Sequence, residues 1–202
     1  MNALDYAFAC RNSYGNAFAW SAGWNISGVQ VYLTTIANDW VLVFRGSQDA
    51  LDWSRDLDAI PYKDNTLGWV DSGFFNGLQD VYKQLFRVGK GQPVSFTGHS
   101  LGGARARLMA GLFIKNGLEV KNLVTFGSPK PAFQGLADII TNSSLIHCSY
   151  RNSNDIVPTV PLTIDPLFDY VHTEQYIQLG DGSGVPCIED HHINNYVKAL
   201  QT

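Results

Sequence analysis

The spacing of apolar residues changes several times along the chain, and each change predicts a new element. In the stretch GVQVYLTT, the apolar residues Val29, Val31 and Leu33 alternate with polar neighbours, which is typical of a β-strand. The run WVLVFR follows a turn at Asn38 and Asp39 and predicts the buried partner of that strand. The first third of the chain therefore contains a strand pair.

Apolar residues at helical spacing predict two long helices in the middle of the chain. The first stripe predicts a helix that ends at Gly89 to Gly91, and the second a helix that ends at the Asn116-Gly117 cap signal. Shorter helical patterns occur near both ends of the sequence. The apolar positions are Phe74, Phe75, Leu78, Val81, Tyr82 and Leu85; Leu101, Ala104, Leu108, Met109, Leu112 and Phe113; Ala3, Leu4, Ala7 and Phe8; and Ile193, Tyr196, Val197 and Leu200.

The remaining segments complete an alternation of strands and helices. PVSFTG, NLVTFG, SLIHCSYR and EQYIQL are short runs that predict strands, whereas residues 47–73 have no clean period and predict a long loop with at most one short helix. No repeat or Pro/Gly/Ser-rich linker divides the sequence. We therefore expect one α/β domain over residues 1–202, with helices on the faces of a sheet.

Composition excludes several classes of function. A net charge of −4 over 202 residues favours neither nucleic acid nor an anionic membrane surface as a partner. No apolar run approaches the length of a transmembrane helix, and the N-terminus lacks the pattern of a signal peptide. We expect a soluble protein that is cytoplasmic, or secreted with its leader absent here. The cysteines Cys10, Cys148 and Cys187 have no metal-ligand spacing, so neither a metal site nor a disulfide scaffold is expected.

The candidate chemistry begins at Gly98-His99-Ser100-Leu101-Gly102, which fits the pattern Gly-x-Ser-x-Gly. A predicted strand leads into this motif and a predicted helix leaves it, an arrangement that holds a serine hydroxyl exposed on a tight turn. The alternative is a glycine-rich corner in which Ser100 only caps the helix. A serine nucleophile also needs a base and an acid, which in α/β-hydrolases follow in the order acid, then histidine.

Four histidines follow Ser100, and their contexts differ. His147 lies inside a predicted strand, where a core role is favoured, and His172 lies in a loop without distinguishing features. His191 and His192 come directly before the last predicted helix, a junction that can deliver an imidazole to the edge of a sheet. For the acid, Asp155 directly follows a predicted strand, although an Asx-turn is an alternative role.

An oxyanion hole needs two donors that converge on the developing negative charge. The backbone N–H of Leu101 is one candidate because Leu101 follows the predicted nucleophile. The loop after WVLVFR supplies the other, since Gly46 permits a sharp turn and Ser47 offers both an N–H and a hydroxyl.

Several of these segments together resemble the class 3 lipases, a family that also contains feruloyl esterases and plant phospholipases. The resemblance rests on VLVFRGS, DWSRDLDAIP, DSGFFNGLQDVY, VSFTGHSLGGARA, LVTFGSPKPA and YRNSNDIVPTVP, in this order. It implies an α/β-hydrolase fold with a mostly parallel sheet, in which Ser100 is the nucleophile and Asp155 the acid, and Ser47 and Leu101 form the oxyanion hole. The family pattern H-x-(M/L/I)-x-x-Y favours His191 over His192 as the base.

The resemblance implies a serine carboxylic ester hydrolase that acts through an acyl-enzyme, without metal or cofactor, on an ester or lipid substrate and with transient contact to a lipid interface. Phospholipase A1 or feruloyl esterase activity on the same triad, acyl transfer to an alcohol and a catalytically silent lipid-binding module are the alternatives. Residues 48–60 occupy the family's lid position, as a moving lid or as a fixed polar loop. One departure is Asp71, where many members have a histidine.

Overall fold

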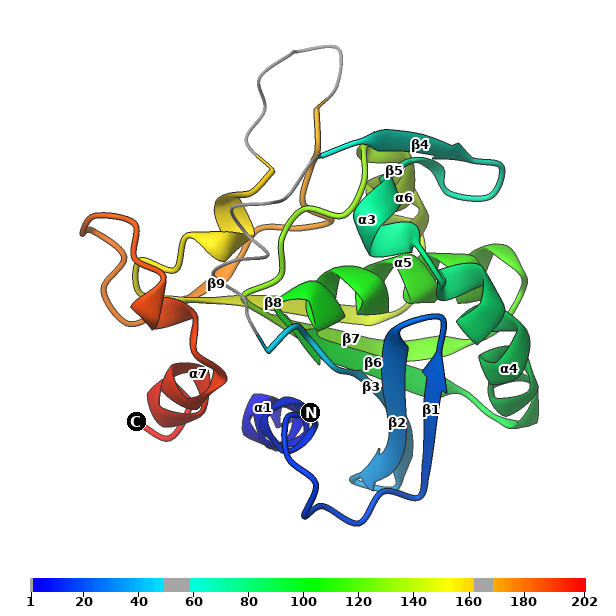
Figure 1. Cartoon of the computed structure of the whole chain (residues 1–202), viewed down its shortest axis with the longest axis horizontal. Coiled ribbons are helices and arrows are strands. Elements are labelled where there is room, and N and C mark those ends of the chain that lie inside the picture. The colour runs from blue at the N-terminus through cyan, green and yellow to red at the C-terminus, as the bar shows by residue number, and fades with distance from the viewer. Residues whose placement is uncertain (1, 49–58, 162–168) are drawn as a thin grey trace.

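The computed structural model describes residues 2–48, 59–161 and 169–202 of the chain. Among these residues, a seven-stranded sheet has the order β1-β2-β3-β6-β7-β8-β9 (Figure 1). Within this sheet, strands β3, β6, β7, β8 and β9 are parallel to one another, and β1, β2 and β3 pair in antiparallel fashion. The bounds are β1 Ala22–Ile26, β2 Val29–Ile36, β3 Asp39–Phe44, β6 Val94–His99, β7 Val120–Phe126, β8 Ile146–Asn152 and β9 Ile177–Leu179.

Helices cover both faces of this sheet (Figure 1). Helices α1 and α7 lie on one face, and α4 and α5 lie on the other, with α3 and α6 beyond them. The helices are α1 Ala3–Asn12, α3 Ser72–Phe75, α4 Leu78–Gly91, α5 Leu101–Lys115, α6 Gln134–Thr141 and α7 Ile193–Ala199, with single 3-10 turns η1 Val157–Thr159 and η2 Glu189–His191. The predicted α/β fold is confirmed by this arrangement.

The sequence of β3 shows why the sheet needs a cover on both sides. Val41 and Val43 pack into the apolar core beneath α1 and α7, whereas Leu42 and Phe44 pack into the core beneath α4 and α5. All four side chains are fully buried. Because successive strand residues point to opposite faces, a continuous apolar run indicates a strand that is buried on both of them.

One predicted helix is wrong in extent. The stripe that starts at Phe74 does not form a single helix, because α3 ends at Phe75 and α4 begins at Leu78. Gly77 separates them with φ 78°, a left-handed conformation that side-chain-bearing residues rarely adopt. The chain therefore turns sharply inside a stripe whose apolar spacing carries on across the break. The predicted end of the helix, at Gly89 to Gly91, is correct.

The segment predicted as a loop contains a β-hairpin, which is a second error. Strands β4, Pro61–Asp64, and β5, Gly68–Asp71, pair with each other apart from the main sheet. Each has four residues, too few to establish a two-residue period in the sequence. Strand β1 and helix α6 were also not predicted. In the part of the chain that the structure describes, no helix is long and apolar enough to cross a membrane.

The ends of the parallel strands bring the predicted site residues to one edge of the sheet. Ser47 follows β3, Ser100 follows β6, Gly127 follows β7 and Asp155 follows β8. In open α/β sheets, the carboxyl ends of the strands are where ligands bind. The fold therefore gathers at this edge segments that are far apart in the sequence.

Candidate active site

Ser100 occupies a strained turn between β6 and α5. Its backbone has φ 60° and ψ −133°, outside the regions that L-residues favour. A Cβ at Gly98 would lie 2.2 Å from the carbonyl oxygen of Gly102, and a Cβ at Gly102 would lie 2.1 Å from that of Phe44. The two glycines of the motif therefore allow strand and helix to approach so closely that Ser100 is forced into this conformation.

The Ser100 side chain does not act as a helix cap. The side chain makes no capping hydrogen bond to α5, and its Oγ is buried without a hydrogen-bond partner among the described residues. Buried hydroxyls are usually hydrogen-bonded, so an unpartnered one is a feature of functional interest. The geometry disfavours the alternative in which Ser100 only caps a glycine-rich corner.

His191 and Asp155 form a buried pair. The Nδ1 atom of His191 lies 2.8 Å from Oδ2 of Asp155, and the two residues are 2 % and 0 % exposed. Because the carboxylate can only accept, Nδ1 carries the proton and the lone pair is on Nε2. That Nε2 is buried and, within residues 2–48, 59–161 and 169–202, has no hydrogen-bond partner. A neutral imidazole in this state is suited to accept a proton.

Two further groups hold the Asp155 carboxylate in place, and a backbone bridge holds its loop. Oδ1 accepts a hydrogen bond from the backbone N–H of Val157 at 2.9 Å, and Oδ2 accepts one from the hydroxyl of Tyr196 at 2.5 Å. A short parallel bridge between Asp155 and Cys187 joins the loop of the acid to the loop that leads to His191. The carboxylate is thus fixed before any substrate binds.

The structure separates the two adjacent histidines clearly. His192 is exposed and stands at the N-terminus of α7, whereas His191 points inward to Asp155. Gly127 makes room for the inner pair: it has φ 55°, and a Cβ there would lie 2.8 Å from Asp155 Oδ2 and 2.9 Å from His191 Nδ1. No sequence pattern singled out Gly127.

The predicted oxyanion donors lie beside Ser100. A Cβ at Gly46 would lie 3.3 Å from the Cβ of Ser100, so the loop that carries Ser47 passes directly next to the nucleophile candidate. Leu101 is the first residue of α5, and N–H groups in the first turn of a helix have no partner within it. The positive end of the helix dipole faces the same place.

Two other histidines downstream of Ser100 belong to a separate buried cluster around Arg107, which is fully buried in α5. Its guanidinium donates to Nδ1 of His172 at 3.0 Å and to the hydroxyls of Thr125 and Ser149. His147 lies at the margin, 3.2 Å from the Ser149 Oγ, in the structural role favoured for it. We call these five residues the Arg107 cluster.

Some predicted features fall outside the described residues. The lid-like segment 48–60 is described only at Gln48, Ala59 and Ile60. Among the described parts of the chain, no group of three or more His, Cys, Asp or Glu side chains is arranged to hold a metal ion. The three cysteines are free thiols.

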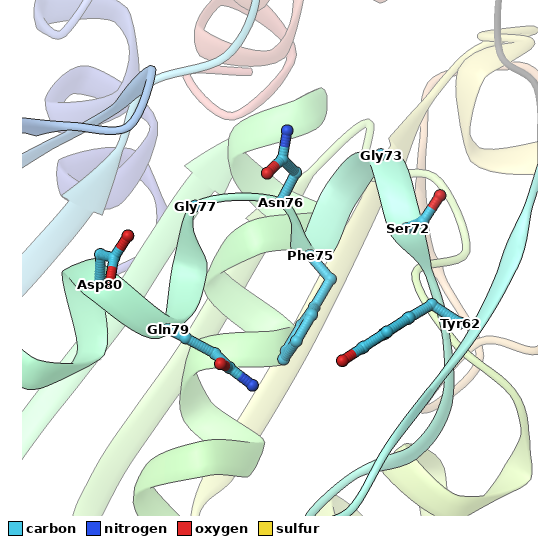
Figure 2. Close-up of a pocket in the computed structure, with 8 residues that line it drawn as sticks. All are labelled: Tyr62, Ser72, Gly73, Phe75, Asn76, Gly77, Gln79 and Asp80. Atoms are coloured by element: carbon cyan, nitrogen blue, oxygen red, sulfur yellow. The ribbon is translucent and has the colours of Figure 1, made fainter.

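A pocket of about 520 Å³ is lined by residues of β4, of the helices α3 and α4 and of the turn between these helices (Figure 2). The rings of Tyr62 and Phe75 stack inside it with their centroids 5.7 Å apart. Ser72 and Gln79 come from the two helices beside them. None of the residues that line it is a candidate catalytic group, so this pocket is distinct from the site at Ser100.

Comparisons with known proteins identify the family of the chain. The sequence profile of the family described as lipase (class 3) matches residues 41–164. The chain belongs to the class 3 lipase family. It is 30 % identical over 155 residues to a lipase of Rhizomucor miehei, which covers 70 % of this chain and 42 % of that protein. It is 34 % identical over 167 residues to a secreted mono- and diacylglycerol lipase of Fusarium solani, covering 77 % and 49 %.

A third relative is the chloroplastic phospholipase A1 PLIP1 of Arabidopsis thaliana, 33 % identical over 57 % of this chain and 20 % of that protein. The chain thus spans less than half the length of these relatives. Among solved structures, the Rhizomucor miehei lipase propeptide complex superposes with a TM-score of 0.72 at 23 % identity, covering 90 % of this chain and 69 % of that one. This likeness supports the α/β-hydrolase fold.

Proposed function

We propose that this member of the class 3 lipase family hydrolyses carboxylic esters, with Ser100 as nucleophile, His191 as general base and Asp155 as the acid. The observation that carries the proposal is a complementary pair of unused groups. A buried hydroxyl donor on Ser100 and a buried acceptor nitrogen on His191 both lack partners among the described residues, while Asp155 fixes the far side of the imidazole. Membership of the family supports the same reaction.

The reaction proceeds in two halves. His191 Nε2 takes the proton of Ser100 as Oγ attacks the ester carbonyl, and the imidazolium then gives that proton to the departing alcohol. Water attacks the resulting acyl-enzyme, with its proton passing to His191 and then back to Ser100 as the carboxylic acid leaves. Asp155 stabilises the imidazolium in both halves through its hydrogen bond to Nδ1.

The oxyanion in each half is stabilised by Ser47 and by the backbone N–H of Leu101. Loss of one such donor typically lowers the rate by about 100 to 1000 fold. Replacement of Ser47 by Ala removes only the hydroxyl and leaves the backbone N–H, so turnover should fall without being abolished.

The names of the relatives support a substrate class, since they include lipase, phospholipase A1 and mono- and diacylglycerol lipase. Acyl esters of glycerol, which the enzyme would meet at a lipid interface, are therefore the first candidates. The proposal also includes a single catalytic domain over residues 1–202 and a lid-like role for residues 48–60. Phospholipase A1 activity is the second candidate. A chain-length series of p-nitrophenyl esters beside a triglyceride emulsion, a phospholipid and methyl ferulate separates these substrates.

The decisive experiment replaces the three proposed residues one at a time. Ser100→Ala should abolish both hydrolysis of p-nitrophenyl esters and labelling by a fluorophosphonate, with an unchanged circular dichroism spectrum. His191→Ala should be nearly inactive, and His192→Ala serves as its control because His192 is exposed. An active His191→Ala enzyme together with an inactive His192→Ala enzyme would transfer the role of base to His192.

A further inference from the structure

We propose that His99, held by Tyr14, is a positioning residue that orients the imidazole of His191. The proposal rests on the proposed function, because it concerns how the general base is held. His99 precedes Ser100 in the chain, yet its ring is directed to His191 rather than to the hydroxyl of its neighbour. We call the connected side chains of Tyr14 and His99 the Tyr14–His99 relay.

Hydrogen bonding sets one tautomer of His99. Its Nε2 lies 2.7 Å from the backbone carbonyl oxygen of His191, and its Nδ1 lies 2.8 Å from the hydroxyl of Tyr14. A carbonyl oxygen only accepts, so Nε2 carries the proton and Nδ1 accepts from Tyr14. The carbonyl of His191 therefore fixes the tautomer of His99, and the hydroxyl of Tyr14 supports this tautomer by donating to Nδ1.

Burial keeps His99 neutral. The residue is 4 % exposed, and its pKa is held well below the ordinary 6.5, first by burial and then by the neighbouring His191. A neutral His99 adds no positive charge beside His191 when the latter takes up a proton. The relay can thus hold the base without opposing its protonation.

The rings add a second constraint. The imidazoles of His99 and His191 stack with centroids 4.5 Å apart and planes 30° from parallel, and Tyr196 packs edge-on against His99. His191 is then held at its backbone by His99, at its ring plane by the stack and at Nδ1 by Asp155. These three contacts fix the direction in which Nε2 of His191 points, and none of them involves Nε2 itself.

Tyr14 also borders the loop of the oxyanion candidate. A Cβ at Gly46 would lie 2.2 Å from the hydroxyl oxygen of Tyr14 and 2.6 Å from the carbonyl oxygen of His99. The relay therefore fits against the loop only because residue 46 is glycine. The segment before β1 thus contributes to the site, although no motif in the sequence pointed to Tyr14.

Three variants separate orientation from simple packing. His99→Phe keeps a flat ring for the stack but removes the donor to the His191 carbonyl, and His99→Gln keeps an N–H at nearly the same position without the ring. Tyr14→Phe removes only the hydroxyl. Tyr6→Phe is the matched control, because Tyr6 is a buried tyrosine of α1 that faces Ser95 and Asn122 instead.

The measurements are kcat, KM and the pH profile of kcat/KM, with kcat and kcat/KM divided by the fraction of sites that a fluorophosphonate labels at saturation. We expect kcat of His99→Phe to fall by about 10 to 100 fold with KM unchanged, since small errors in orientation have effects of this size. His99→Gln should recover most of this loss. In Tyr14→Phe, kcat should fall by about 3 to 10 fold, because Nδ1 of His99 loses its hydrogen-bond donor and the ring is held less firmly, and Tyr6→Phe should match the wild type.

The pH profile supplies a readout that packing alone would not move. Among the described residues, Asp155, His99 and Tyr196 are titratable groups packed around His191, and His192 follows it in the chain. A loosened imidazole has a weaker hydrogen bond to Asp155, which destabilises the imidazolium, so the acid limb should move to lower pH in His99→Phe and Tyr14→Phe.

The outcomes distinguish this proposal from the one it rests on. A wild-type protein that neither hydrolyses esters nor reacts with the fluorophosphonate overturns the proposed function and the relay together. An active wild type with unchanged kcat per labelled site and an unchanged pH profile in Tyr14→Phe and His99→Phe overturns the relay alone. Should His99→Phe not fold, Tyr14→Phe decides by itself, because it leaves every ring in place.

Discussion

Two histidines, the buried His99 and the half-buried His172, hold two different loops, and they do so in contrasting surroundings. His99 donates from Nε2 to the carbonyl of His191, and His172 donates from Nε2 to the carbonyl of Pro158, which follows the loop of Asp155. The group that donates to Nδ1 differs: it is a tyrosine hydroxyl for His99, and the guanidinium of Arg107 for His172.

The difference lies in charge. Burial lowers the pKa of His172 to about 3, with Arg107 as the second cause, so His172 is neutral like His99. Arg107 is charged and fully buried, and the titratable carboxylate of Glu174 faces the same region. The groups that hold Pro158 (His172 and Arg107) should therefore govern stability and its pH dependence. The groups that hold His191 (His99 and Tyr14) should govern turnover.

The largest effect is expected when the charged side chain of Arg107 is removed. Arg107→Met leaves Nδ1 of His172 and the hydroxyls of Thr125 and Ser149 without their donor, and should lower the free energy of unfolding by about 3 to 5 kcal/mol. Urea denaturation measures it. Arg105→Met on the same helix is the control and should cost about 1 kcal/mol or less, because the hydrogen bond that Arg105 makes among the described residues is a long one, 3.5 Å to the carbonyl oxygen of Gly28. Equal losses for the two variants would contradict the assigned importance of the cluster.

The residues that hold the two loops also mark the limit of what the sequence could predict. Ser100, Asp155 and Ser47 follow strands in motifs with local signals, and the parallel topology that brings such ends together is a general property of α/β folds. Tyr14 and His172 stand in segments without a pattern, and their partners are 85 and 65 residues away in the chain. Contacts at that separation depend on the folded sheet, which no local period reveals.

Secondary structure shows the same limit. The long parallel strands were recognised because burial on both faces produces continuous apolar runs, as in β3. The hairpin of β4 and β5 was missed because its partner strand, and the packing of Tyr62 on Phe75, are tertiary features. The break at Gly77 was missed because the apolar stripe continues across it.

The second prediction tests how closely the proposed base and acid are packed. Gly127→Ala would place a methyl group 2.8 Å from Asp155 Oδ2 and 2.9 Å from His191 Nδ1, closer than such contacts occur. The pair should separate, and kcat for a p-nitrophenyl ester should fall by about 100 fold, equivalent to about 2.7 kcal/mol. Gly117→Ala is the control, because Gly117 has a similar positive φ but no atom within 4 Å of the added methyl. Comparable losses of kcat in both would attribute the effect to backbone strain.

The third prediction concerns the hydroxyl of Tyr196, which donates to the carboxylate of Asp155. Tyr196→Phe removes the 2.5 Å hydrogen bond to Oδ2 and leaves the ring in the core. A hydrogen bond to a charged group contributes about 1.5 to 3 kcal/mol, so the free energy of unfolding should fall by about 2 kcal/mol at pH 7. Turnover should fall less than in Gly127→Ala, because His191 keeps its contact to the carboxylate. Chemical denaturation and ester kinetics on the same preparations measure both. An unchanged unfolding midpoint would show that water replaces the hydroxyl without loss.

The smallest expected effect is on the pH dependence of stability, and it tests the charge near Arg107 that the surroundings of His99 lack. Burial raises the pKa of Glu174 from its ordinary 4.5 to about 7 in the folded protein, with Arg107 opposing the rise. The folded state therefore binds this proton more tightly than the unfolded state, so the stability it contributes is complete below pH 4.5 and is lost as the pH rises to about 7. Asp71, whose pKa burial raises to about 6, acts in the same direction at lower pH.

In Glu174→Gln the side chain has no proton to lose in this range, so the fall in stability between pH 6 and 7.5 should become shallower. The fall in stability that Asp71 causes below pH 6 should remain. Urea midpoints at pH 5, 6 and 7.5 measure the change, and Glu119→Gln, at an exposed position, should retain the wild-type dependence. Because His99 is neutral throughout this range and Tyr14 titrates far above it, Tyr14→Phe should leave the slope unaltered. A slope that changed in Tyr14→Phe but not in Glu174→Gln would place the titrating charge beside His191 and reverse the comparison.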